Sequence, residues 1–307
     1  MTSRPLRSVL FVAGSDVHGL ERALDHGADG LIVDLEEPQT PMTPAVRERA
    51  RALVSSFLDD LPAEHPTIFC RVQPARTGGM WDDVMACLKP GLAGIAVPKS
   101  YGPADIHAAD GVLTNAEAVV GRPLGSTWIY PIFETAEAIR QAYEIAVASP
   151  RVAYMGGAVS RFGDIHQALG YRWTAEGRET QWLRSKLLVD ARAAGIRYPI
   201  SGMWGGASDD LDGLRAFAAE LRDLGYYGMM LGDPAHIALV HEIFTPTAAE
   251  VAYWVELDRL GADADRTGIG PVLYGDPNQG EGHVVHGAHI ESARLNLEWA
   301  RALGLAK

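Results

Sequence analysis

Two acidic side chains, Glu134 and Asp164, follow apolar runs of this 307-residue chain. Glu134 comes directly after TWIYPIF, and Asp164 lies in the polar segment after RVAYM. Without a histidine cluster beside them, two carboxylates suit a hard cation such as Mg²⁺, which completes its shell with waters and substrate oxygens. A 2-oxo acid supplies two such oxygens, and the cation would stabilise the enolate formed when a carbon–carbon bond breaks or forms. Mn²⁺ is the alternative metal. Both acids could instead cap helices.

A second group of charged residues has the same position relative to apolar runs. The run at 31–33 is followed by Asp34, Glu36 and Glu37. Arg71 is the next-to-last residue of TIFCRV, and Lys99 directly follows GIAVP. A guanidinium fork fits a carboxylate, so Arg71 is the candidate substrate clamp, with a structural ion pair to the nearby acids as the alternative. The acids could position water or a proton donor, and otherwise would be a solvated strand end. Lys99 is a candidate substrate contact. A Schiff-base role is less favoured, because it would need a desolvated amine.

The elements that must position these side chains form a repeat. Eight short apolar runs alternate with longer helical patterns, and the runs are continuous, as in parallel strands buried on both faces. Thr43 and Pro44 predict the start of the second helix. Eight such units favour an α/β fold of the (β/α)₈ TIM-barrel type, whose chemistry lies at the carboxyl ends of the strands. The predicted strands are 9–13, 31–33, 67–72, 94–97, 127–133, 151–155, 196–200 and 228–231.

The pattern changes near the end of the chain. We predict a catalytic barrel over residues 1–246 and a helical extension over 247–307 that covers an active site, its own or a neighbouring subunit's. Packing on the side of the barrel is the alternative. Three histidines at three-residue spacing (His283, His286, His289) suggest a helix start or lid more than a metal site. Asp276 or Glu281 could enter a neighbour's site.

Composition limits the partners of the chain. A formal net charge of −12 argues against nucleic acid, which needs a basic face. No stretch is long and apolar enough to span a bilayer, and the first residues do not look like a signal peptide. Cys70 and Cys87 form no CxxC motif, which favours a reducing cytoplasm over a disulfide framework.

From about Arg7 to Val251 the chain resembles the HpcH/HpaI aldolase and citrate lyase beta-subunit superfamily. RSVLFVAG is similar to that family's RSxLFVPG, GADGLIVDLEEP to GADxxxxDLED, RVQP to RVNP, and VPKS to its PK turn. IFETAEAI and FGDIHQALG resemble the segments that supply the family's metal-binding glutamate and aspartate, here Glu134 and Asp164. FTPTAAEV resembles the segment that closes the barrel. The order and spacing of these motifs make the match specific.

The resemblance implies a Mg²⁺-dependent lyase that cleaves or forms a carbon–carbon bond in a hydroxy acid or its CoA thioester, of the citrate, malyl or citramalyl type. It also implies a homo-oligomer, a trimer or hexamer. Arg7 joins Arg71 and Lys99 as an expected substrate contact. Two departures, Met229 and Asp233 where the family has lysine and histidine, favour an aldolase for a free 4-hydroxy-2-oxo acid as the alternative. A third hypothesis is a non-catalytic barrel that serves as a binding subunit.

Overall fold

The computed structural model describes residues 3–267, 273–275 and 282–306 and contains one sheet of eight parallel strands. Neighbouring strands follow the order β6-β5-β4-β3-β2-β1-β8-β7. The strands are β1 (Ser8–Ala13), β2 (Gly30–Asp34), β3 (Thr67–Arg71), β4 (Leu92–Val97), β5 (Trp128–Phe133), β6 (Gly156–Gly157), β7 (Ile200–Met203) and β8 (Gly228–Leu231). This confirms the predicted (β/α)₈ barrel.

The two outer strands of that order, β6 and β7, lie next to each other. The Ile200 amide donates to the Met155 carbonyl at 3.3 Å, and the Met203 amide donates to the Val159 carbonyl at 3.0 Å. These bonds join the segment around β6 to β7, so the sheet is nearly closed. The strands therefore present their carboxyl ends at one mouth, which is the property that a site built from several strands requires.

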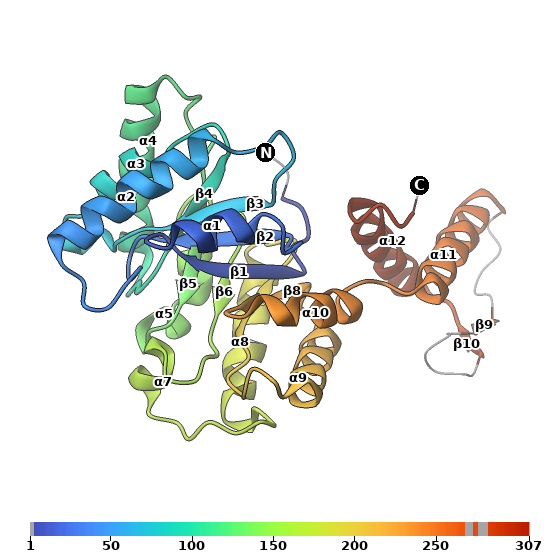
Figure 1. The fold of residues 1–307 in the computed structure, drawn as a ribbon. Helices are drawn as coiled ribbons and strands as arrows, with labels where there is room; N and C mark the ends of the chain where they lie inside the picture. The colour runs from blue at the N-terminus through green and yellow to red at the C-terminus, as the bar shows by residue number, and fades with distance from the viewer. Residues whose placement is uncertain (1–2, 268–272, 276–281, 307) are drawn as a thin grey trace. The chain divides into compact units, whose positions relative to one another are not determined.

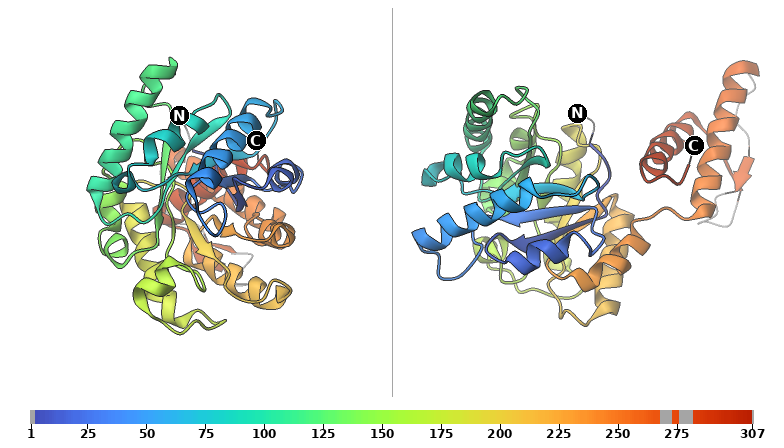
Figure 2. Two further views of the ribbon diagram at one scale, coloured as in Figure 1. Left: turned by 60° about the vertical axis from the view of Figure 1, so that its left-hand side comes forward. Right: turned by 45° about the horizontal axis from the view of Figure 1, so that its top comes forward.

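Helices surround the sheet on its outer side (Figures 1 and 2). Thr43 caps the second of them, its hydroxyl accepting the Val46 amide, and Pro44 is the first helical residue, as predicted. The helices of this unit are α1 (Val17–Ala23), α2 (Pro44–Asp59), α3 (Met80–Cys87), α4 (Pro103–Val120), α5 (Ala136–Arg140), α6 (Ala142–Ala146), α7 (Asp164–Leu169), α8 (Gln181–Ala193), α9 (Leu211–Leu224) and α10 (Ile237–Ile243), with 3-10 turns at Ala75–Thr77, Arg178–Thr180 and Pro234–His236.

The core has an inner and an outer part. The larger outer cluster packs the helices onto the sheet. The smaller cluster contains Phe69, Tyr130, Tyr154 and Met230 and fills the interior of the barrel. Phe69 makes edge contacts with both tyrosine rings at centroid distances of 5.3 and 5.4 Å. A packed interior leaves space for a ligand only at the ends of the barrel.

Two strand predictions were wrong in position. The sixth strand is Gly156–Gly157, not 151–155, because Arg151 is held in buried ion pairs and Val152 forms only an isolated bridge. A Cβ at Gly156 would lie 2.6 Å from the Tyr130 hydroxyl, so only glycine fits there. The seventh strand begins at Ile200 because the preceding Pro199 has no amide hydrogen to donate.

Residues Thr245–Lys307 form a second compact unit, two residues earlier than the predicted boundary. Helices α11 (Ala248–Thr267) and α12 (Gly287–Ala302) pack against each other, with Trp254 and Trp299 rings 6.1 Å apart. A short antiparallel pair, β9 (Leu273–Gly275) and β10 (Gly282–Val284), completes the unit. The predicted role of this unit as a lid stays a prediction. Asp276 and Glu281 lie outside the described residues.

Within the described residues, no helix combines the length and apolar character that crossing a membrane requires. Both cysteines are buried and free.

Candidate active site

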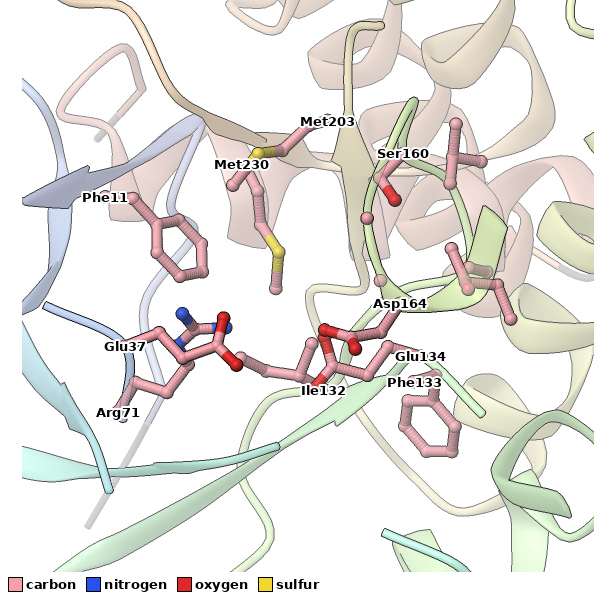
Figure 3. A pocket seen from close by; sticks show the side chains of 15 residues that line it. Phe11, Glu37, Arg71, Ile132, Phe133, Glu134, Ser160, Asp164, Met203 and Met230 are labelled. Atoms are coloured by element: carbon pink, nitrogen blue, oxygen red, sulfur yellow. The ribbon is translucent and has the colours of Figure 1, made fainter. Parts of the chain in front are cut away.

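A cavity of about 260 Å³ lies at the carboxyl ends of the barrel strands (Figure 3). Its charged wall contains four of the residues that the sequence singled out, Glu37, Arg71, Glu134 and Asp164. The remainder is mostly apolar. The cavity is lined by Phe11, Glu37, Arg71, Ile132, Phe133, Glu134, Gly157, Ala158, Val159, Ser160, Gly163, Asp164, Ile165, Met203 and Met230.

Arg71 is fixed at the end of β3 by acids from the end of β2. Its Nε and Nη2 donate to the two Asp34 carboxylate oxygens at 2.9 and 2.8 Å, and Nη1 lies 3.1 Å from Glu36 Oε2. The register pairs Asp34 directly with Arg71, which explains the contact. Burial alone would lower the Arg71 pKa, but the hydrogen bonds from Arg71 to Asp34 outweigh it and raise that pKa. The guanidinium is therefore a permanent, rigidly held cation in the cavity wall.

Lys99 contacts acids that follow two different strands, β2 and β6. Its Nζ lies 2.8 Å from both Glu36 Oε1 and Glu37 Oε1 and 3.6 Å from Asp164 Oδ2. Burial lowers the Lys99 pKa, but the bond to Glu36 leads the contributions that raise it above its usual value. A protonated amine is no nucleophile, so the structure argues against a Schiff base. Lys99 also has a positive φ of 48°, unusual for a side chain of this kind.

Glu134 follows β5 and points into the same cavity. Its Oε1 accepts the Lys99 backbone amide at 2.8 Å. Burial raises the pKa of the Glu134 carboxyl to about 7, against the opposing influence of Arg71. The helix-cap alternative is wrong for Glu134, because the Thr135 hydroxyl caps α5 by accepting the Ala138 amide at 3.0 Å. It is also wrong for Asp164, which is the first residue of α7 after its N-cap Gly163.

The Glu134 and Asp164 carboxylates come from different elements and lie side by side in Figure 3. Among the described residues no group of three or more histidine, cysteine, aspartate or glutamate side chains could hold a metal ion. Two carboxylates at an open cavity nevertheless fit Mg²⁺, which retains waters and takes substrate oxygens as further ligands. The half-buried Glu134 also feels the negative charges of Glu36 and Asp164, and such a concentration of carboxylates favours a compensating cation.

Glu36 is the most enclosed of the predicted acids at the end of β2. The residue is buried, and burial raises the pKa of its carboxyl despite the nearby Arg71. Its neighbour Glu37 is exposed and lines the cavity. Asp34 is committed to Arg71 and also accepts the Glu36 amide at 3.0 Å. Of the three acids, Glu37 is thus the one that a ligand in the cavity can reach.

Arg7 is not brought to this cluster. It precedes β1, at the amino end of the barrel, and its Nε is 2.8 Å from Asp29 Oδ2. Because the cavity is at the carboxyl ends, Arg7 has a structural position, and the expected substrate contact finds no support. Asp233 follows β8 and accepts the Ala235 amide at 2.9 Å.

The sequence reasoning missed the apolar wall of the cavity. Phe11, Ile132, Met203 and Met230 all lie on strands, and none of them was among the predicted site residues. Phe11, Ile132 and Met230 alternate along their strands with residues of the outer core. That period of two could have indicated side chains that point into the barrel. Met203 could not be found this way, since it lies beyond the predicted seventh strand.

Comparison with known proteins agrees with this geometry. The family model described as HpcH/HpaI aldolase/citrate lyase matches residues 7–234. The chain belongs to this family. It is 29% identical to the citrate lyase subunit beta of Haemophilus influenzae, covering 96% of this chain and 97% of that protein. It is also 30% identical to a (3S)-malyl-CoA thioesterase of Cereibacter sphaeroides, covering 98% and 96%.

Two solved structures of this family show the same fold. A citrate lyase from Burkholderia xenovorans matches with a TM-score of 0.77 at 18% identity, covering 100% of this chain and 94% of that one. The protein CitE from Mycobacterium tuberculosis, solved in complex with magnesium, acetoacetate and coenzyme A, matches with a TM-score of 0.69 at 21% identity, covering 97% and 98%. The family's citrate lyase beta subunits and related enzymes thus share this barrel.

Proposed function

We propose that the chain is a Mg²⁺-dependent carbon–carbon lyase acting on a hydroxy acid or its CoA thioester. The observation that carries the proposal is the cavity in which Glu134, Asp164 and Arg71 meet. The two carboxylates can hold a cation that binds substrate oxygens, and the guanidinium can bind the substrate carboxylate. Together they provide what an enzyme needs to bind a 2-oxo acid. A cytoplasmic homo-oligomer, with the C-terminal unit as a lid, is part of the proposal.

In this proposal Glu134 and Asp164 hold the metal, and Mn²⁺ is the alternative ion. A bound Mg²⁺ supplies Lewis-acid stabilisation of negative charge on substrate oxygen. Arg71, which lines the cavity, binds the substrate carboxylate. Asp34 positions Arg71, and the Lys99 amide positions Glu134 at 2.8 Å. The Lys99 ammonium adds positive charge beside the substrate.

Cleavage requires one proton to leave the substrate hydroxyl as the adjacent carbon–carbon bond breaks. The hydroxyl carbon becomes a carbonyl, and the departing carbon takes the electron pair as an enolate that is then protonated. Glu37 is the acid best placed to take and return this proton, because it lines the cavity. The Lys99 amine lies 2.8 Å from the Glu37 carboxylate and holds it in place at the cavity. Buried Glu36 positions Lys99.

Thioester hydrolysis is a second candidate, because a relative at 30% identity is named a (3S)-malyl-CoA thioesterase. Product analysis separates the two reactions. A lyase releases an oxo acid and leaves the thioester bond intact, whereas hydrolysis releases the CoA thiol. A panel of malyl-, citramalyl- and citryl-type thioesters beside free 4-hydroxy-2-oxo acids, with Mg²⁺, tests both. It also tests the free-acid aldolase that Met229 and Asp233 favour.

The proposal expects oxo-acid release without thiol release, and loss of at least a hundredfold in turnover for Glu134→Gln. Glu137→Gln is the matched control, since Glu137 is exposed on the neighbouring α5. Thiol release without an oxo acid would replace the lyase by the thioesterase. No turnover of any substrate by the wild type would favour a non-catalytic binding subunit.

A further inference from the structure

An arginine on the loop after β6 is stacked between aromatic rings beside the cavity. The Arg161 guanidinium carbon lies 4.7 Å from the Phe162 ring centroid and 5.1 Å from the Trp173 ring centroid. Trp173 in turn meets Trp204 edge to face at 5.4 Å. Aromatic faces attract a guanidinium and limit its motion. Arg161 is thus a pre-oriented cation on an exposed loop.

The backbone of this loop is held in an unfavourable conformation. Phe162 has a φ of +62°, and the residue is 81% exposed. Its amide donates to His166 Nδ1 at 3.1 Å, while His166 Nε2 lies 2.7 Å from the Tyr171 carbonyl oxygen. An exposed phenylalanine in the left-handed region gains nothing from burial. Such a conformation is retained near sites where it serves binding.

Gly205, on the loop after β7, leaves the space that the stack requires. A Cβ added there would lie 2.6 Å from both Arg161 Cβ and Trp173 Nε1. The Gly205 carbonyl oxygen accepts a long bond of 3.5 Å from Arg161 Nη1. The loops after β6 and β7 therefore meet at Arg161, and the arrangement depends on a glycine.

Charge is what this stack offers to a ligand. Among the residues that the structure describes, no carboxylate pairs with Arg161, although the chain carries a formal net charge of −12. The residues on either side of the Arg161–Phe162 pair, Ser160 and Gly163, line the cavity. Arg161 is thus on the loop that forms part of the cavity wall, and among the described residues its guanidinium makes one hydrogen bond, to the Gly205 carbonyl oxygen.

We infer that Arg161 is a specificity residue that binds a second anionic group of the substrate, beyond the carboxylate held at Arg71. This rests on the proposed function. The group is a carboxylate or phosphate, because both accept the paired donors of a guanidinium. It has two sources: the distal carboxylate of a dicarboxylic oxo acid, or the phosphates of a CoA thioester. Arg161 therefore selects substrates by charge at the end remote from the bond that breaks.

Calorimetric titration of the full chain with Mg²⁺ and three probes tests the inference. Pyruvate lacks a distal anion, oxaloacetate carries a distal carboxylate, and CoA carries phosphates. Arg161→Gln should weaken oxaloacetate or CoA by about tenfold or more and leave pyruvate within about twofold. The affected probe identifies the source. Arg172→Gln, at an exposed arginine in the segment that follows α7, is the matched control and should change none of the three.

Two further variants separate charge from geometry. Arg161→Lys keeps the charge and loses the fork and most of the stacking, so it should weaken the same probe less than Arg161→Gln does. Gly205→Ala leaves the charge unchanged but displaces Arg161, and should also weaken that probe. Equal weakening of pyruvate, or an effect no larger than that of Arg172→Gln, would overturn the inference. Failure of the wild type to bind pyruvate with Mg²⁺ would instead count against the proposed function. If CoA still bound in that case and its binding depended on Arg161, the inference would be supported.

Discussion

Replacing Arg71 by methionine separates what this arginine does for the fold from what it does for a substrate. The Arg71 and Asp34 side chains are only 13% and 10% exposed, and two hydrogen bonds of 2.9 and 2.8 Å join them. Removing one partner of a buried ion pair leaves the other charge uncompensated and costs about 3–5 kcal/mol. At roughly 2–4 °C per kcal/mol for a domain of this size, Arg71→Met should lower the Tm by roughly 6–20 °C.

Scanning calorimetry measures the stability, and titration with oxalate and Mg²⁺ measures carboxylate binding. Arg76→Met is the matched control, since its pair with Asp105 is 41% exposed on the arginine side. A surface pair of this kind contributes about 0–1 kcal/mol, so the control should lose a few degrees at most and bind oxalate normally.

The double variant Arg71→Met with Asp34→Asn completes the experiment. Because the uncompensated charge is gone, it should recover much of the lost Tm, yet it should still fail to bind oxalate. Recovery of oxalate binding in the double variant would show that Arg71 serves only to neutralise Asp34. A Tm loss no greater than that of Arg76→Met would refute the buried-pair argument itself.

Three further predictions concern other parts of the barrel. Burial works to raise the Glu117 pKa, but hydrogen bonds from Arg151 at 2.8 and 2.9 Å bring it down to about 2. The stability that this pair contributes is complete above about pH 4.5 and is lost as pH falls toward 2. Urea unfolding should show that loss in the wild type and not in Glu117→Gln. At pH 7 the Glu117→Gln variant should be about 3 kcal/mol less stable than the wild type. Gly156→Ala, with its Cβ 2.6 Å from the Tyr130 hydroxyl, should cost about 1–3 kcal/mol in the same assay. Since burial raises the Glu134 pKa to about 7, Mg²⁺ affinity measured by titration should fall roughly tenfold per pH unit below that value, and a flat profile from pH 8 to 5 would contradict Glu134 as a ligand.

Much of the site could be predicted from strand ends alone. Asp34 and Arg71 each close a run of apolar residues, and parallel strands in register bring their ends together, as the Asp34–Arg71 pairing shows. Glu134 also follows an apolar run and lies at the cavity, as its strand-end position predicts. Arg7 does not lie there, because it precedes its strand, and a motif match says nothing about which end of the barrel a residue occupies.

Other features depend on contacts that the sequence does not encode locally. The sixth strand was misplaced because Val152 and its neighbours look like a strand. The ladder instead forms at Gly156 and Gly157, where an added Cβ would meet the Tyr130 hydroxyl at 2.6 Å and the Phe133 backbone at 2.7 Å, respectively. The Arg161 stack includes Trp173, which is 12 positions after Arg161, and Trp204, which is 43 positions after it. The loop that carries Arg161 has no periodic pattern. Only the folded chain brings them together.

The most direct test of the proposed site is the affinity for Mg²⁺ in the presence of oxalate, a stable mimic of a bound oxo acid. We predict one metal per chain for the wild type, and at least tenfold weaker binding for both Glu134→Gln and Asp164→Asn, with Glu137→Gln unchanged. Unaltered Mg²⁺ affinity in both site variants would contradict the assignment of Glu134 and Asp164 as the metal ligands.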